Sequence, residues 1–271
     1  MRINSAILDG AKFLKSKHIS SAYLDSEILM AKAIRKDRKY ILLNSDKKIT
    51  HQDFLNFSKF IKKRSLRKPI AYIINKKFFW KSEFFVTRDT LIPRPDTEIL
   101  IECILNYSKN KNKQNILDIG VGSGCILLSI LKEKKNFIGS GIDISKDALN
   151  ICKINAVKLN VINRLKLYKT NVDKYNLGKY DLIVSNPPYI NKNKIKYLDK
   201  DILSYEPLMA LDGGLDGLSE IRKVINKSSD LIKKKGKFIL EIGFDQKNRV
   251  IKLLERKGFY INNIKKDLAN N

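Results

Sequence analysis

The apolar residues between positions 5 and 67 recur at the three- and four-residue spacing of an amphipathic helix. They fall into three groups: Ile7, Leu8, Ala11 and Leu14; Tyr23, Leu24, Ile28, Leu29 and Ala31; and Phe54, Leu55, Phe57, Phe60 and Ile61. This spacing predicts a small helical bundle. Thr50 followed by Asp53 is typical of a helix start, and Pro69 is expected to stop the last helix.

The pattern changes between residues 70 and 86, where β-branched and aromatic residues cluster. Polar residues interrupt the cluster at positions 75–77 and 81–83, which predicts a short β-hairpin. We expect the hairpin to lie in a connector, residues 70–93, between an N-terminal helical domain, residues 1–69, and a second domain, residues 94–271.

The second domain contains five short apolar runs separated by segments of helical length. The runs cover residues 115–119, 137–142, 165–168, 180–185 and 237–242. Buried runs that alternate with helices are typical of a parallel sheet covered on both faces. The sequence therefore predicts an α/β fold with a doubly wound sheet, whose ligand lies at the carboxyl ends of the central strands.

Composition excludes several classes of protein. The chain has two histidines, His18 and His51, and its three cysteines lack a CxxC spacing, so we expect no metal site and no disulfide framework. No window approaches the roughly 18–20 apolar residues of a membrane span, and the N-terminus lacks a secretory apolar region. We therefore expect a cytoplasmic protein with no membrane partner.

A glycine-rich turn follows the first predicted strand, with Gly120, Gly122 and Gly124 in alternate positions. A dinucleotide site needs the spacing GxGxxG, but Cys125 occupies the place of the third glycine there, and no GK[ST] phosphate loop is present. Asp143 ends the next strand, where a carboxylate can accept hydrogen bonds from two ribose hydroxyls. The spacing therefore favours a nucleoside without a pyrophosphate.

This combination resembles the cofactor site of the Rossmann-like methyltransferases, which bind S-adenosylmethionine with a DxGxGxG loop and an acidic residue after the second strand. The resemblance implies S-adenosylmethionine as the cofactor. A tight strand-to-helix turn and a helix cap are the plainer interpretation of the two elements, and it explains each of them separately but not their occurrence together.

The tetrapeptide Asn186-Pro187-Pro188-Tyr189 ends the predicted strand at residues 180–185. A planar amide or exocyclic amine is a poor nucleophile because its lone pair is delocalised. If the Asn186 side-chain oxygen and the Pro187 carbonyl each accept one N–H, they stabilise the transition state of methyl transfer to that nitrogen. Tyr189 can stack on the planar group. The motif resembles the signature of the amino-group methyltransferases, and this resemblance implies adenine, guanine or glutamine as the group that is methylated.

The whole chain resembles the release factor glutamine methyltransferases, also called HemK or PrmC proteins. Besides the glycine loop and the Asn-Pro-Pro-Tyr motif, the segments at residues 90–98, 204–208 and 240–243 match that family. The resemblance implies methyl transfer from S-adenosylmethionine to the glutamine side-chain amide in the Gly-Gly-Gln motif of class 1 peptide release factors. The partner would then be a release factor, with nucleic acid not required and the enzyme a monomer.

The resemblance implies that the domain at residues 1–69 recognises the substrate and that the domain at residues 94–271 is the methyltransferase domain. It also implies roles for individual residues. Those expected to bind the cofactor are Gly120, Val121, Gly122, Ser123, Gly124, Asp143, Asn171 and Asn186. Those expected to bind the substrate glutamine are Asn186, Pro187, Pro188 and Tyr189, of which Asn186, Pro187 and Tyr189 would be catalytic. Relatives often have Asp at the position of Asn171, so either Asn171 or Asp173 contacts the adenine.

Three charged residues at the start of the second domain, Arg94, Asp96 and Glu98, allow two interpretations. They either close the cofactor site and orient the release factor, or form a salt-bridged turn that caps the next helix. Glu206 and residues 212–214 are expected in loops over the cleft, or in plain turns.

The alternative function is methylation of an amino group in nucleic acid, which the formal net charge of +26 favours. Enzymes that act on bases in DNA need an added region for target recognition and base flipping. In this chain, the part outside the predicted sheet domain is a helical bundle. The Lys-rich stretches also contain many Asn and Ile residues, as codon bias in an A+T-rich genome would produce. We interpret the charge as a background property that aids encounter with an acidic release factor.

Overall fold

The computed structural model describes residues 1–267 and divides into two compact units. The helical unit contains Met1–Asn75 together with Asp199–Tyr205. The sheet unit contains Lys76–Leu198 and the described residues from Glu206 onward. The short segment at residues 199–205 is thus separated in sequence from the rest of its unit, which the sequence had not indicated.

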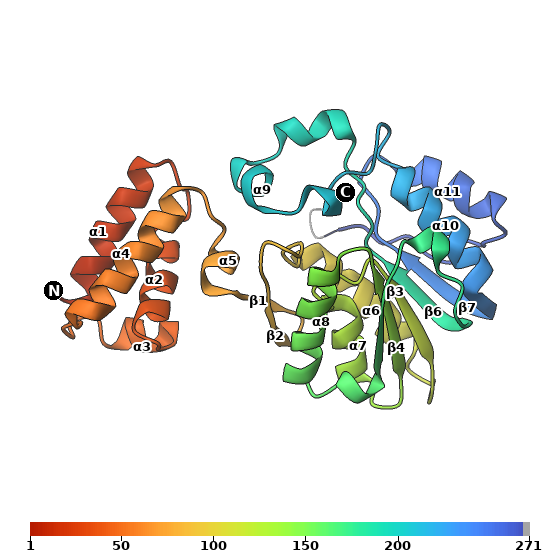
Figure 1. The fold of residues 1–271 in the computed structure, drawn as a ribbon, viewed down its shortest axis with the longest axis horizontal. Helices are drawn as coiled ribbons and strands as arrows, with labels where there is room; N and C mark the ends of the chain where they lie inside the picture. The colour runs from red at the N-terminus through yellow and green to blue at the C-terminus, as the bar shows by residue number, and fades with distance from the viewer. Residues whose placement is uncertain (268–271) are drawn as a thin grey trace. The chain divides into compact units, whose positions relative to one another are not determined.

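The helical unit is built on five N-terminal helices, of which α1, α2 and α4 lie side by side in Figure 1. They are α1 (Ile3–Ser16), α2 (Ala22–Ala33), α3 (Arg38–Leu43), α4 (His51–Ser65) and α5 (Ile70–Ile74). Their apolar faces meet in one core that includes Leu14, Leu29 and Phe57. Thr50 caps α4 by accepting a hydrogen bond from the Asp53 N–H at 3.1 Å, as predicted.

Residues 70–74 form the helix α5, so the expectation that the whole stretch from residue 70 is a hairpin is wrong. Pro69 lies at the N-cap of α5, where its fixed φ suits a helix start, and it does not end α4. Asn75 then ends α5 in the left-handed conformation, with φ +57°. The antiparallel hairpin follows as β1 (Lys76–Phe79) and β2 (Ser82–Phe85).

The sheet unit contains a parallel sheet of five strands in the order β5-β4-β3-β6-β7, which confirms the predicted fold class. The strands are β3 (Asn115–Ile119), β4 (Ile138–Asp143), β5 (Leu165–Lys169), β6 (Tyr180–Ser185) and β7 (Ile232–Leu240). The longer helices of this unit are α6 (Glu98–Tyr107), α7 (Cys125–Glu133), α8 (Lys146–Lys158), α10 (Ser219–Leu231) and α11 (Lys247–Arg256). Short 3-10 helices are η1 (Pro95–Thr97), η2 (Ile162–Arg164), η3 (Val172–Lys174), η4 (Lys192–Tyr197) and η5 (Leu208–Ala210).

Helices cover both faces of this sheet. Leu127 of α7 packs against Gly139 of β4, which is paired with Ile116 of β3. Leu117, the next residue of β3, points to the opposite face and shares a core with Val224 of α10. No helix of the part of the chain that the structure describes is long and apolar enough to cross a membrane.

The topology brings the two predicted motifs together. Strand β3 is first in the sequence of the sheet but central in space, with β4 on one side and β6 on the other. Ile119 and Ser185, the last residues of β3 and β6, are paired in the sheet. Gly120 and Asn186 therefore start from neighbouring positions at the carboxyl edge, where the chain reverses its direction of winding and α/β sheets bind ligands.

Candidate active site

The glycine loop follows β3 and exposes part of its backbone. Gly120, Gly122 and Gly124 have φ values of +78°, +53° and +82°, which side chains rarely allow. A Cβ at Gly124 would lie 2.7 Å from the Cys152 sulfur, so this glycine is needed for packing. A Cβ at Gly120 would meet nothing within 4 Å, and one at Gly122 would only touch the Gly120 oxygen at 4.0 Å. These two glycines leave backbone exposed to a ligand.

Val121 and Ser123 are buried within the same loop, 4% and 3% exposed. Their side chains are therefore part of the protein interior and do not line the exposed surface of the glycine loop. Asn155, which the sequence analysis missed, supports the loop from α8. It is fully buried and its amide donates to the Ser123 carbonyl at 2.9 Å and to the Phe85 carbonyl of β2 at 2.9 Å. A lone Asn in a helix gives no sequence signal for this role.

Asp143 stands at the end of β4 and faces the glycine loop. One carboxylate oxygen accepts a hydrogen bond from the Gly122 N–H at 2.9 Å, and the other accepts from the Ser145 N–H at 2.9 Å. Each oxygen keeps a second lone pair, so both can still accept from a pair of ribose hydroxyls. Burial raises the pKa of Asp143, although the backbone donors oppose that shift.

Asp118, the acidic residue that opens the glycine motif, is a further buried carboxyl group. It is 1% exposed, and neither of its oxygens has a hydrogen-bond partner among the described residues. Burial, and next the negative charge of Asp143, raise the pKa of Asp118 to about 7. A cation bound at the loop would stabilise the ionised form. The site therefore favours a positively charged ligand.

Asn171 lies just beyond the carboxyl end of β5. Its side-chain oxygen accepts a hydrogen bond from the Asp173 N–H at 3.1 Å and so starts the short helix η3. Asp173 itself is exposed, and its negative charge acts on Lys223 of α10. The contact of Asn171, or of Asp173, with an adenine stays a prediction.

A chain of three hydrogen-bonded side chains holds Asn186 at the end of β6. The Asn186 amide nitrogen donates to the Thr97 hydroxyl at 3.2 Å, and that hydroxyl donates to the Glu241 carboxylate at 2.8 Å. The proton of Thr97 is used by the carboxylate, so its oxygen can only accept from Asn186. The amide nitrogen therefore faces Thr97, and the amide oxygen is left free to accept a hydrogen bond.

Glu241 also orients Tyr189. The Tyr189 hydroxyl donates to the other oxygen of this carboxylate at 3.3 Å. Burial and the nearby negative charge of Glu241 raise the pKa of Tyr189, so the phenol stays protonated and remains a donor. Burial raises the pKa of Glu241 in turn. The half-buried carboxylate of Glu241 thus positions both polar side chains of the Asn-Pro-Pro-Tyr motif.

The backbone of the motif is fixed separately. Pro187 is buried, and the Tyr189 carbonyl accepts a hydrogen bond from the Gln246 amide at 2.8 Å. Gly213 packs so closely that a Cβ there would lie 2.9 Å from the Pro188 oxygen. The turn at residues 212–214 therefore lies against the motif and supports it.

Comparisons with known proteins cover both units. The model of the PrmC N-terminal domain matches residues 5–74, and that of the methyltransferase small domain matches residues 95–205. A release factor glutamine methyltransferase from Clostridium acetobutylicum is 36% identical, with 99% of this chain and 95% of the relative covered. The chain belongs to this family.

A second relative agrees with that assignment. A release factor glutamine methyltransferase from Buchnera aphidicola subsp. Schizaphis graminum is 39% identical, covering 95% of this chain and 92% of the relative. Among solved structures, a ribosomal protein L11 methylase from Lactobacillus delbrueckii subsp. bulgaricus is 20% identical with a TM-score of 0.48, over 64% of this chain and 74% of that one. The two relatives and the family models confirm the predicted family and enzyme class, a methyltransferase.

In this member of the release factor glutamine methyltransferase family, Arg94 forms a salt bridge with Glu206 at 2.6 Å. The other oxygen of Glu206 accepts from the Ile92 N–H at 3.3 Å, and Glu98 accepts from the Trp80 N–H at 2.7 Å. These contacts favour the interpretation of Arg94 and Glu98 as residues that stabilise turns. Asp96 acts differently, since its negative charge helps to raise the pKa of Glu241.

Sequence analysis assigned no role to Thr97, Glu241 or Asp118. Thr97 and Glu241 do lie in the segments at residues 90–98 and 240–243 that match the family, which was the available signal. Cys125 follows the loop, but burial raises the pKa of its thiol to about 12, so it is not a nucleophile. No cluster of potential metal ligands exists among residues 1–267.

Proposed function

We propose that this chain transfers a methyl group from S-adenosylmethionine to the glutamine side-chain amide in the Gly-Gly-Gln motif of class 1 peptide release factors. The observation that carries the proposal is the hydrogen-bond chain from Glu241 through Thr97 to Asn186, which leaves an amide oxygen free beside the glycine loop. Such an acceptor suits a planar N–H substrate. The names of the relatives support the release factor as the molecule that carries it.

The residues present suit S-adenosylmethionine. The exposed backbone at Gly120 and Gly122 would accommodate it, with Asp143 on its ribose hydroxyls and the unpartnered carboxyl of Asp118 favouring its positive charge. When bound, S-adenosylmethionine supplies an electrophilic methyl group on a positively charged sulfur. Val121, Ser123 and Gly124 would maintain the conformation of the loop that binds it. The contact with the adenine is proposed for Asn171.

The substrate nitrogen has a delocalised lone pair and needs assistance to react. The Asn186 side-chain oxygen and the Pro187 carbonyl would each accept one of its two N–H groups and so hold the nitrogen in line with the methyl group. Both contacts strengthen as positive charge develops on the nitrogen, so they stabilise the transition state more than the ground state. The alkylated nitrogen is acidic and would then lose one of its two protons to water, which leaves the neutral N-methyl amide. Tyr189, held by Glu241, would stack on the amide plane next to Pro188.

The proposal is tested by incubating the purified chain with labelled S-adenosylmethionine and, in separate reactions, a release factor, DNA and ribosomal RNA. The release factor should be labelled, also after nuclease treatment, and DNA and RNA should not. Labelling of nucleic acid with an inert release factor would establish the alternative, amino-group methylation of a base. We further expect the protein to act in the cytoplasm and to be a monomer. Gel filtration tests whether it is a monomer.

A further inference from the structure

The segment Asp199–Tyr205 lies in an unusual place along the chain. It belongs to the helical unit, although the residues on both sides of it, Leu198 and Glu206, belong to the sheet unit. Three peptide links therefore join the two units: Asn75–Lys76, Leu198–Asp199 and Tyr205–Glu206. The second of these follows the Asn-Pro-Pro-Tyr motif by only nine residues.

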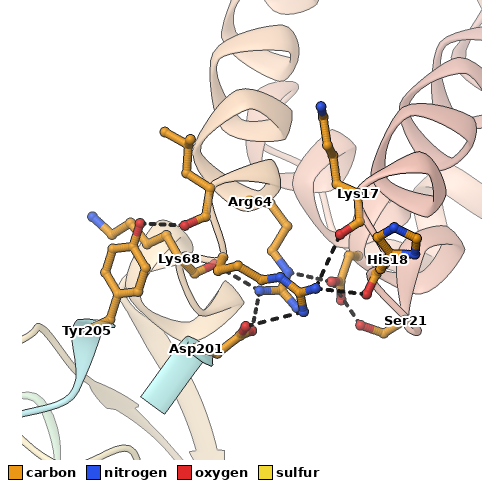
Figure 2. Close-up of polar contacts among 10 residues, drawn as sticks. Lys17, His18, Ser21, Arg64, Lys68, Asp201 and Tyr205 are labelled. Atoms are coloured by element: carbon orange, nitrogen blue, oxygen red, sulfur yellow. Dashed lines mark hydrogen bonds and ion pairs between the residues drawn. The ribbon is translucent and has the colours of Figure 1, made fainter. Parts of the chain in front are cut away.

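The helix α9 (Lys200–Tyr205) in this segment contains no buried residue. A helix of six residues is unstable by itself, and the apolar residues of this one, Ile202, Leu203 and Tyr205, are only half-buried. Its polar contacts with the rest of the helical unit are drawn in Figure 2. Asp201 pairs with Arg64 at 2.5 Å and with Arg67 at 3.7 Å, and the Tyr205 hydroxyl donates to the Leu66 carbonyl at 2.7 Å.

Arg64 is the centre of these contacts. Its side chain, on α4, is 9% exposed and also pairs with Asp25 of α2 at 2.7 Å, an acid whose side chain is 6% exposed. A third contact is made to the Lys68 carbonyl at 3.3 Å. A buried guanidinium with two carboxylate partners is costly to leave half-paired, so it favours the docked state of α9.

Both ends of the connecting chain are fixed in the sheet unit. Ile190, directly after the motif, donates to the Leu211 carbonyl at 3.1 Å and accepts from the Gly213 N–H at 2.9 Å. Glu206, directly after α9, is 5% exposed and bonded to Arg94. Docking of α9 therefore adds two covalent connections between the units to the one at Asn75–Lys76. It also closes a loop between two fixed ends, which restricts the conformations of the residues around α9.

We propose that the ion pair between Arg64 and Asp201, here called the latch, is a positioning device for the macromolecular substrate. It holds α9 on the helical unit and so pre-organises the surface that binds a release factor, while the reacting groups stay untouched. This inference rests on the proposed function. Arg64 and Asp201 are positioning residues: they act on the affinity for the substrate protein and contact neither the cofactor site nor Asn186.

The test compares Asp201→Asn with Asp199→Asn, a matched control. Both variants remove one negative charge from the same segment, but Asp199 is exposed and makes no contact with Arg64 among the described residues. Asp201→Asn should raise KM for the release factor at least about tenfold, because the surface must then be ordered upon binding. Its kcat and its KM for S-adenosylmethionine should stay close to wild type, as should all constants of Asp199→Asn.

A second measurement separates the latch from a general loss of structure. The amide of Leu203 is bonded to the Asp199 carbonyl at 3.1 Å within α9. Its hydrogen exchange should become faster in Asp201→Asn, while amides of the core helices keep their protection. Asp201→Glu keeps the negative charge and should therefore keep the slow exchange and the low KM of the wild type. Tyr205→Phe is a milder change and should shift both quantities in the same direction as Asp201→Asn.

Unchanged exchange in Asp201→Asn would overturn the latch itself. Faster exchange with an unchanged KM for the release factor would overturn its role in substrate binding. If wild-type protein fails to methylate any release factor, the proposed function fails, and with it the role of the latch in affinity. Faster exchange of Leu203 would in that case still establish the latch as a structural element, so the two failures are distinguishable.

Discussion

Replacing Glu241 by Gln changes one atom in the centre of the candidate site. The carboxylate of Glu241 accepts from both Thr97 and Tyr189, at 2.8 and 3.3 Å. A Gln side chain has the same shape but only one accepting oxygen, so its NH2 group must face one of these hydroxyls. If it faces Thr97, the Thr97 proton turns toward Asn186, whose amide then reverses and presents its NH2 group to the substrate.

The size of the effect follows from the hydrogen bond that is lost. A hydrogen bond to a charged group contributes about 1.5–3 kcal/mol, and each 1.4 kcal/mol is a factor of ten, so kcat should fall roughly 10- to 100-fold. The KM for S-adenosylmethionine should change little, because Glu241 contacts the substrate motif and not the glycine loop. Glu255→Gln, the same change at an exposed position of α11, is the matched control and should behave as wild type.

The pH dependence of kcat gives an independent check. Burial raises the pKa of Glu241 above its ordinary value of 4.5. Wild-type kcat should therefore fall as the pH decreases through that raised pKa, since the protonated acid can no longer accept from both hydroxyls. Glu241→Gln cannot titrate and should lack this acid limb. A variant with wild-type kcat, or with the same acid limb, would refute the role given to the hydrogen-bond chain.

Two further substitutions test the neighbouring groups. Asn186→Ala should lower kcat by about 10²-fold or more in the labelling assay, with less change in cofactor affinity; full activity would contradict its role. Because the pKa of Asp118 in the folded protein is raised to about 7, the stability it contributes is present at low pH and is lost as the pH rises through that value. Without ligand, urea unfolding should show wild type losing roughly 2.5 kcal/mol between pH 5 and pH 8, and Asp118→Asn should lack this dependence.

The sheet was predictable because its signal is local. Buried runs and glycine turns fix the strand positions, so β3 and β6 begin and end where they were expected. Strand β7 was placed at residues 237–242 but covers Ile232–Leu240, since its first half is rich in lysine and carries no apolar run. The helix α5 was missed because four of its five residues are β-branched or aromatic, which is the composition of a strand.

The candidate site was predictable only in part. Asn186 and the glycines are consecutive in motifs, whereas the groups that orient them come from distant positions such as Thr97 and Glu241. A polar residue acquires such a role through tertiary contacts that no local pattern encodes. The same holds for Asp201, whose partner Arg64 is 137 residues away in the sequence.

The most direct test of the account is to locate the methyl group on the product. A release factor treated with the enzyme and S-adenosylmethionine is digested, and the peptide that contains Gly-Gly-Gln is sequenced by tandem mass spectrometry. The account predicts the added mass of one methyl substitution on the glutamine side chain, and no such product from a release factor with that Gln replaced by Ala. A methyl group on any other residue, or on nucleic acid alone, would contradict it.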